Sequence, residues 1–340
     1  KIPTGARLRP WHNTPPWVAN PAMQALAKGW PLKISLQERL NRASLPLIRF
    51  FQTSLPPSVA NRLIRAGLAG VRLGPGVRRQ AITADGVPCE WLIPENHQAD
   101  RALLYLHGGG FVFGLTPPHL LLGASLARRL GLRVLMVDYR LAPQHPFPAA
   151  LDDCARAYHW LLGQGIAAQQ VVVAGDSAGG NLTLTLLLKL RAAGESLPAA
   201  AACLSPVADL TPTEAPPAGL KDPLLPTKVM NFYKRSYIGA GDPRDPLISP
   251  AFGSLHGLPP LLLHVGEKEV LRADAVRIAD LARSAGVEVQ LEIYARMWHV
   301  WQINLALPQA SHSLDQIAHF FEAHLPGTSP ASMNDMKIPK

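Results

Sequence analysis

Strand-like and helix-like segments alternate along most of this chain, and the alternation limits the fold more than any other feature. From residue 81 onward, short apolar runs are separated by longer segments with apolar residues at helical spacing. Strands connected through helices run parallel, and helices then cover both faces of the sheet. The pattern predicts an α/β fold with a mostly parallel eight-stranded sheet. The expected strands are 102–106, 133–137, 171–174, 199–204, 261–265 and 287–293, with an antiparallel pair in 79–94 turning at Asp85-Gly86. The expected helices are 120–130, 149–162, 178–193, 272–285 and 311–324.

Two segments interrupt this rhythm. Residues 1–78 are Pro-rich and helical in pattern, and residues 207–260 form a long insertion between two strands. Connections of this length are usually functional or disordered. We expect 79–325 to be one catalytic domain, with 1–78 and 207–260 forming a helical cap over the C-terminal edge of the sheet, where ligands bind in open α/β folds. The polar tail, 326–340, is expected to be mobile.

The composition excludes several other classes of protein. A net charge of +9 requires acidic partners to be considered, but the basic residues are scattered and form no nucleic-acid module, so we expect a solvated basic surface. The three cysteines, Cys89, Cys154 and Cys203, have neither disulfide-framework nor metal-site spacing. No apolar stretch approaches the ~20 residues that span a bilayer. We therefore expect no integral membrane segment, no metal and a reduced cytoplasmic setting.

The most informative motif is Gly175-Asp176-Ser177-Ala178-Gly179, which lies between an apolar strand and a helix. A G-x-S-x-G turn in that position holds the serine in a strained conformation and exposes its hydroxyl at the edge of the sheet. The helix that follows directs free N–H groups at any oxyanion formed there. A serine that only caps the helix is the alternative. The strand–turn–helix context favours Ser177 as a nucleophile.

A second motif, His107-Gly108-Gly109-Gly110, directly follows the strand at 102–106. Hydrolases with a G-x-S-x-G turn supply oxyanion donors from this position, and glycines let backbone N–H groups face a tetrahedral intermediate. Phosphate binding is the alternative, but neither dinucleotide nor P-loop spacing is present. We expect His107 to shape this loop by hydrogen bonding. The catalytic base should come last in the chain.

Of the twelve histidines, His299 follows the last strand and precedes the last helix, where the base of a Ser, acid, His order falls. His312, His319 and His324 are expected to face solvent from the final helix, and His264 is expected to be packed within a strand.

Together these motifs resemble the hormone-sensitive-lipase-like family of α/β-hydrolases, the bacterial family IV esterases, over about residues 81–325. The matching motifs are His107-Gly-Gly-Gly-Phe111, Asp138-Tyr-Arg-Leu-Ala-Pro143 with Phe147-Pro-Ala149, Gly175-Asp-Ser-Ala-Gly-Gly-Asn181, Ser205-Pro206 and Met297-Trp-His299. The resemblance implies a carboxylesterase for short acyl chains, with an α/β-hydrolase fold, a helical cap, no cofactor and often a homodimer. Its site residues carry over as the catalytic triad Ser177, Glu269 and His299, with an oxyanion hole at Gly108, Gly109, Gly110 and Ala178.

The acid departs from the usual family pattern. Most members carry Asp in D-x-L, whereas this chain has Glu269-Val270-Leu271. Glu267 has nearly the same spacing to His299, but only Glu269 matches the acid-x-Leu pattern. Asp274 is expected on a helix surface. Which two of the three glycines donate stays open.

Four polar residues of these motifs, Asp138, Tyr139, Asp176 and Asn181, are expected to support the loops rather than bind substrate.

The predicted reaction is acyl transfer from a small ester to Ser177, followed by hydrolysis. Three alternatives stay open. One is an interfacial lipase, suggested by the basic charge and the apolar residues of 45–55; another is amide or carbamate cleavage; the third is a non-catalytic binding protein on the same scaffold. The aromatic residues expected to close a compact pocket are Trp11, Trp17, Trp30 and Phe232.

Overall fold

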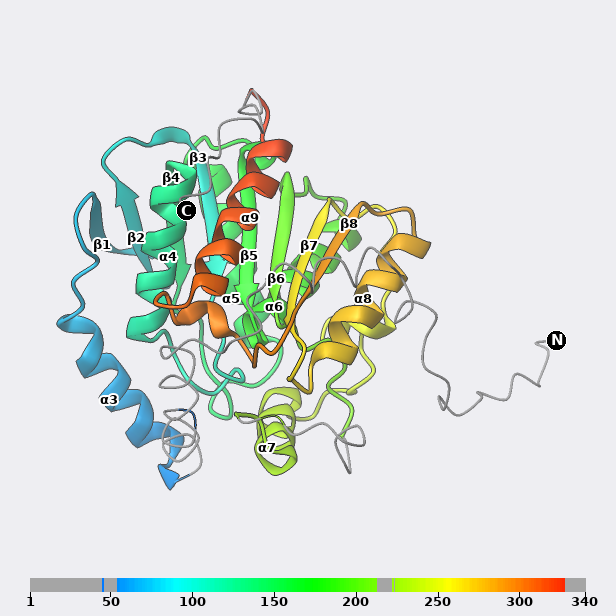
Figure 1. The fold of residues 1–340 in the computed structure, drawn as a ribbon. Helices are drawn as coiled ribbons and strands as arrows, with labels where there is room; N and C mark the ends of the chain where they lie inside the picture. The colour runs from blue at the N-terminus through cyan, green and yellow to red at the C-terminus, as the bar shows by residue number, and fades with distance from the viewer. Residues whose placement is uncertain (1–44, 46–53, 213–221, 223, 328–340) are drawn as a thin grey trace.

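A computed structural model describes residue 45 and residues 54–212, 222 and 224–327. It contains one eight-stranded sheet in the order β1-β2-β4-β3-β5-β6-β7-β8 (Figure 1). β2 runs antiparallel to both β1 and β4, and all other neighbouring pairs are parallel. The prediction of a mostly parallel eight-stranded sheet is confirmed. The strands are β1 Val77–Ala84, β2 Val87–Pro94, β3 Gln98–Leu106, β4 Leu132–Val137, β5 Val171–Asp176, β6 Ala200–Leu204, β7 Leu261–Gly266 and β8 Val289–Tyr294.

Helices cover both faces of the sheet. Residues of α4 and α9 pack against one face, and residues of α5, α6 and α8 pack against the other (Figure 1). The helices are α3 Pro57–Ala69, α4 Pro117–Leu130, α5 Ala149–Gly163, α6 Ala178–Ala192, α7 Thr227–Ile238, α8 Arg272–Ser284 and α9 Pro308–His324, with short 3₁₀ turns at Ala168–Gln170, Pro250–Phe252 and Trp301–Ile303. In the described ranges, no helix has the length and apolar character needed to cross a membrane.

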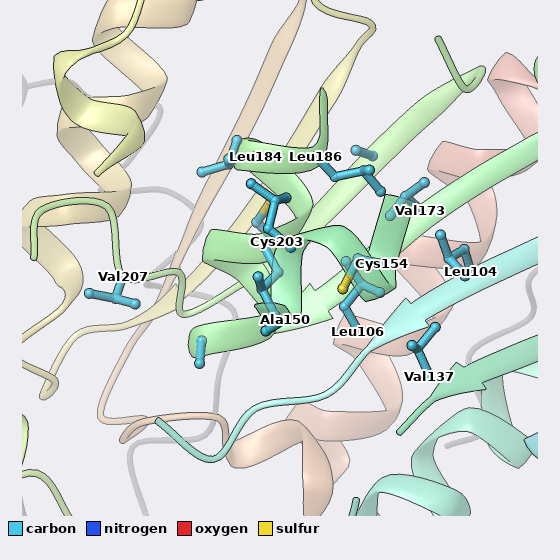
Figure 2. Close-up of a cluster of buried hydrophobic side chains, with 14 of the residues drawn as sticks. Leu104, Leu106, Val137, Ala150, Cys154, Val173, Leu184, Leu186, Cys203 and Val207 are labelled. Atoms are coloured by element: carbon cyan, nitrogen blue, oxygen red, sulfur yellow. The ribbon is translucent and has the colours of Figure 1, made fainter. Parts of the chain in front are cut away.

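The strands show the alternation expected of a sheet with two buried faces. In β3, Leu104 and Leu106 join the cluster under α5 and α6, whereas Leu103 and Tyr105 join the cluster under α4 and α9. Figure 2 shows the first cluster, in which side chains of β3 and β4 meet those of the central strands and of α5 and α6. The rigid core formed in this way fixes the carboxyl ends of β3, β5, β6 and β7.

Asp85 and Gly86 join the two opening strands, as predicted. Both have positive φ, 47° and 79°, which is the backbone that a two-residue hairpin turn requires.

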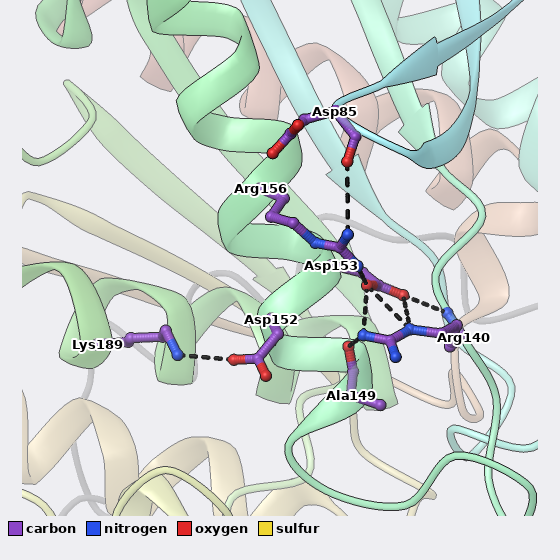
Figure 3. Close-up of polar contacts among 7 residues, drawn as sticks. All are labelled: Asp85, Arg140, Ala149, Asp152, Asp153, Arg156 and Lys189. Atoms are coloured by element: carbon purple, nitrogen blue, oxygen red, sulfur yellow. Dashed lines mark hydrogen bonds and ion pairs between the residues drawn. The ribbon is translucent and has the colours of Figure 1, made fainter.

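A network of ion pairs fixes the segment after β4 to α5 (Figure 3). Arg140 donates from its backbone N–H and its guanidinium to Asp153, at 2.8–3.1 Å. Arg156 donates to the same carboxylate and to Asp85 O. Asp153 is buried, so these bonds anchor the segment that begins at Asp138 and Tyr139.

The predicted cap segments are described only in part. α3 belongs to the first and α7 to the second, and both contribute residues to the cavity described below. Trp11, Trp17 and Trp30, and the tail from residue 328, lie outside the described residues.

Candidate active site

Ser177 occupies the turn between β5 and α6. Its φ of 54° and ψ of −114° are strained for a non-glycine residue, and its N–H donates to Leu204 O at 2.8 Å. A Cβ on Gly179 would overlap the carbonyl oxygen of Leu106, and a Cβ on Gly175 would overlap that of Gly179. The two glycines of the motif are therefore needed because backbone segments approach each other closely here.

His299 joins Ser177 to Glu269. Its Nε2 lies 2.9 Å from Ser177 Oγ, and its Nδ1 lies 2.7 Å from Glu269 Oε2. Ser177 and Glu269 lie 122 and 30 positions before His299 in the chain, yet the three side chains form one line of hydrogen bonds. The structure brings together the three residues of the predicted triad.

Two neighbours fix the carboxylate of Glu269, which is fully buried. Its Oε1 accepts hydrogen bonds from Ser205 Oγ at 2.8 Å and from Gly266 N. Ser205 Oγ in turn accepts from Val300 N at 3.2 Å. Sequence analysis matched the Ser205-Pro206 motif but assigned Ser205 no role, and its place directly after β6 was a further available signal.

Glu267 faces a different group. Its Oε2 accepts from Arg296 N at 2.8 Å, and its Oε1 lies 3.0 Å from Lys268 Nζ.

The position of Asp274 corrects an expectation. Its carboxylate is not a free surface group but accepts backbone hydrogen bonds from Ala208 at 2.7 Å and Asp209 at 3.1 Å. Burial raises the pKa of Asp274 to about 6, because the charged form loses water.

The environment of His299 favours its protonated form. Burial alone would lower its pKa, but the hydrogen bond and the negative charge of Glu269 outweigh burial, and the pKa lies above the ordinary value of 6.5. A proton taken from Ser177 would therefore be stabilised on the imidazole.

Only some of the backbone N–H groups in the glycine loop after β3 are free to bind an oxyanion. Gly108 N donates to Asp176 Oδ1 at 2.9 Å, and the same oxygen accepts from Tyr105 OH at 2.9 Å. The N–H of Gly108 is thus engaged and not available to an oxyanion, which corrects the inclusion of Gly108 in the expected oxyanion hole and leaves Gly109 and Gly110 of the three glycines. Within the described residues, no hydrogen bond engages the N–H of Gly109, Gly110 or Ala178.

The supporting residues lie beneath this loop. Tyr139 OH donates to His107 O at 2.7 Å, and the two rings stack with centroids 4.2 Å apart. His107 Nδ1 lies 2.7 Å from Gly108 O, and burial lowers its pKa to about 3, so the ring is neutral and donates. Asp138 forms an ion pair with α3 instead: its Oδ2 lies 3.8 Å from Nη2 of Arg65.

Asn181 supports the insertion rather than the turn alone. Its Nδ2 donates to Val207 O and Ile248 O, both at 3.0 Å.

Sequence reasoning missed His119, whose Nε2 lies 3.3 Å from Asp176 Oδ2. The T-x-x-H spacing at the start of α4, a capping box, was its available signal.

The other histidines lie mostly as predicted. His264 is fully buried in β7, and His312 and His319 are exposed on α9. His324 is an exception, because it is half-buried and packs against Phe320 with ring centroids 4.5 Å apart.

Ser177 and His299 open into a mainly apolar cavity of about 590 Å³. α3 contributes Leu63 and Ile64, and α7 contributes Met230 and Tyr233. Phe232 does not line this cavity; its side chain is 46% exposed on the outer side of α7. Tyr233, the next residue, takes the place expected for Phe232.

No group of three or more histidine, cysteine or carboxylate side chains is arranged to hold a metal ion in the part of the chain that the structure describes.

Comparisons with known proteins identify the family and the fold of this chain. The family model described as "alpha/beta hydrolase fold" matches residues 103–303. The chain is 41% identical over 242 residues to an acetyl-hydrolase of Streptomyces hygroscopicus, covering 70% of this chain and 81% of the relative. It is 37% identical over 268 residues to an esterase of Acinetobacter venetianus, covering 78% and 82%.

The crystal structure of an esterase from the bacterial hormone-sensitive lipase family superposes with a TM-score of 0.76 at 34% identity, covering 84% of this chain and 98% of that one. The chain therefore belongs to the alpha/beta-hydrolase family, in its hormone-sensitive-lipase-like group of esterases.

Proposed function

We propose that the protein hydrolyses carboxylic esters through an acyl-enzyme on Ser177. The observation that carries the proposal is the line of hydrogen bonds from Ser177 through His299 to Glu269 at the edge of an apolar cavity. A serine nucleophile needs an adjacent base, and the base needs a group that orients it. His299 takes the proton of Ser177 as Oγ attacks the ester carbonyl, then delivers it to the leaving alcohol. A water molecule then attacks the acyl-enzyme. His299 takes the proton of this water and returns it to Ser177 Oγ as the carboxylic acid leaves.

The oxyanion of the tetrahedral intermediate is stabilised by the backbone N–H groups of Gly109, Gly110 and Ala178. Gly108 is excluded because Asp176 accepts its hydrogen bond. Glu269 holds the imidazole in the tautomer with Nδ1 protonated and stabilises the imidazolium. No cofactor takes part in these steps.

α3 and α7 act as cap helices that close the cavity over Ser177. Their apolar side chains favour the hydrophobic parts of an ester, and the names of acetyl-hydrolase relatives support a short acyl group. The test is a series of p-nitrophenyl esters from acetate to palmitate. The highest kcat/KM on acetate or butyrate supports the proposal, and a maximum at the long chains contradicts the short-acyl part of it.

One observation favours a second candidate function, hydrolysis of esters at a lipid surface. Val59 and Leu63 on α3 and Phe232 on α7 are large exposed apolar side chains, and neither helix contains an Asp or Glu. Basic residues beside exposed apolar ones suit an anionic lipid surface. Turnover of emulsified triacylglycerol that exceeds turnover of soluble short esters would favour this function.

A further inference from the structure

Three consecutive residues of the loop after β3 have positive φ. Gly109 has φ 118°, Gly110 has φ 63° and Phe111 has φ 62°. Glycine adopts such a backbone readily, but a bulky residue such as phenylalanine does not. Strained backbone of this kind persists only where surrounding structure fixes it. The same loop carries the two N–H groups assigned above to the oxyanion hole, so what holds Phe111 in place also bears on the reaction.

α7 holds this loop from the cap side. The ring of Tyr237 stacks on the ring of Phe111 with centroids 3.7 Å apart and planes 8° from parallel. Tyr237 is fully buried, and its carbonyl accepts from Phe147 N at 2.7 Å, which fixes the helix end. One turn earlier, the ring of Tyr233 lies so close to Gly110 that any Cβ there would overlap it. Two rings of one helix face therefore cover two successive residues of the loop.

α3 holds the other end of the same loop. Asn61 Nδ2 donates to Val112 O at 2.8 Å, and Asn61 Oδ1 accepts from Gly114 N at 3.0 Å. One amide side chain thus satisfies a backbone acceptor and a backbone donor two residues apart. Beneath the loop, Asp176 and Tyr139 fix its first residues through Gly108 N and His107 O. The catalytic domain also fixes the carbonyl of Phe111, which accepts from Ala142 N at 2.9 Å. The contacts of α7 and α3 add the ring of Phe111 and the backbone of Val112 and Gly114.

We propose that Tyr237 and Asn61 are positioning residues for the oxyanion hole. The cap helices set the geometry of the Gly109 and Gly110 N–H groups as well as enclosing the substrate. This inference rests on the proposed function of Ser177 and deepens it, because it makes the position of the cap a determinant of transition-state stabilisation. A cap displaced by a small distance would leave the triad intact and the oxyanion donors misaligned.

The ring of Tyr237, rather than its hydroxyl, carries this role. The hydroxyl groups of Tyr233 and Tyr237 are buried and have no hydrogen-bond partner among the described residues. Removal of the Tyr237 hydroxyl should therefore preserve the stack, whereas removal of the ring should release Phe111.

The experiment compares Tyr237→Leu, Tyr237→Phe and Asn61→Ala with the wild type, with Phe232→Leu as the matched control. Phe232 lies on the same helix but is exposed and outside the cavity. Three quantities are measured: kcat and KM on p-nitrophenyl acetate, and Ki for a trifluoromethyl ketone. The ketone forms a tetrahedral adduct with the nucleophilic serine, and the oxyanion of the adduct needs the same donors as the intermediate. Thermal unfolding shows which variants are folded.

We expect Tyr237→Leu to lower kcat by about 10- to 100-fold with KM changed less than about threefold, because the donors matter in the transition state. Ki for the ketone should rise by a matching factor. Asn61→Ala should show the same pattern to a smaller degree, and it keeps the test decisive if Tyr237→Leu does not fold. Tyr237→Phe and Phe232→Leu should retain wild-type kcat and Ki.

A rise in KM alone would overturn the inference, because the cap helices would then affect substrate binding and not the stabilisation of the transition state. An unchanged Ki despite a lower kcat would also overturn it, as would Tyr237→Phe being as impaired as Tyr237→Leu. Failure of the proposed function looks different: the wild type would not hydrolyse the ester, or Ser177→Ala would still do so.

Discussion

The carboxylate of Glu269 lies 2.7 Å from His299 Nδ1, whereas Glu267, two residues earlier, binds Arg296 N at 2.8 Å. Two carboxylates of one loop thus have separate partners. This relationship distinguishes the candidate orienting acid from its neighbour and makes the pair suitable for a matched test.

Glu269→Gln should lower kcat severely, by up to about 10⁴-fold, because an amide keeps the shape but favours the wrong tautomer of His299. Glu267→Gln should lower kcat only mildly, because its carboxylate faces Arg296 and Lys268. Steady-state kinetics on p-nitrophenyl acetate measures both. The reverse ranking would refute the assignment of the acid.

The pH dependence of kcat/KM should report the raised pKa of His299. The base must be neutral to accept a proton, so activity falls as pH drops below that pKa. Because Glu269 raises it, the inflection should lie above 6.5, and Glu269→Gln should move it to lower pH. An inflection that stays in place in this variant would show that Glu269 does not interact with the titrating group.

Gly179→Ala should unfold the protein or lower its free energy of unfolding by about 1–3 kcal/mol or more, since its Cβ would overlap Leu106 O. Gly163→Ala is the matched control, because no atom lies within 4 Å of a Cβ at that helical position. The control should be neutral or slightly stabilising. Urea unfolding compares the two, and equal stabilities would contradict the close approach of the strand to the helix.

Asp274→Asn should gain stability relative to the wild type as pH rises. The pKa of Asp274 is about 6 in the folded protein, above that of an unfolded aspartate, so the wild type loses stability between about pH 4 and pH 6. Asparagine does not titrate, and its Oδ1 can still accept from Ala208 and Asp209. The difference in the free energy of unfolding should reach about 1–3 kcal/mol at pH 7 and vanish near pH 4. A difference that is independent of pH would contradict the raised pKa.

Much of this fold could be predicted because each signal is local. Apolar runs fixed the strands to within a few residues, and the strand–turn–helix context placed Ser177 at the end of β5. What could not be predicted depends on residues far apart in the chain. Gly108 loses its free N–H to Asp176, 68 residues later, and Asp274 binds the backbone of 208–209, about 65 residues earlier. Phe232 and Tyr233 are adjacent aromatics, and only the packing of α7 decides which one faces the cavity.

The most direct test of the central claim is covalent labelling of the nucleophile. The protein is treated with a phosphonate ester that reacts with activated serines, and peptide mass spectrometry locates the adduct alongside assays of esterase activity. We predict one adduct, on Ser177, that forms in proportion to the loss of activity. Ser177→Ala should remain folded, take up no label and lose turnover. An adduct on another residue, or esterase activity retained in Ser177→Ala, would contradict acyl transfer through Ser177.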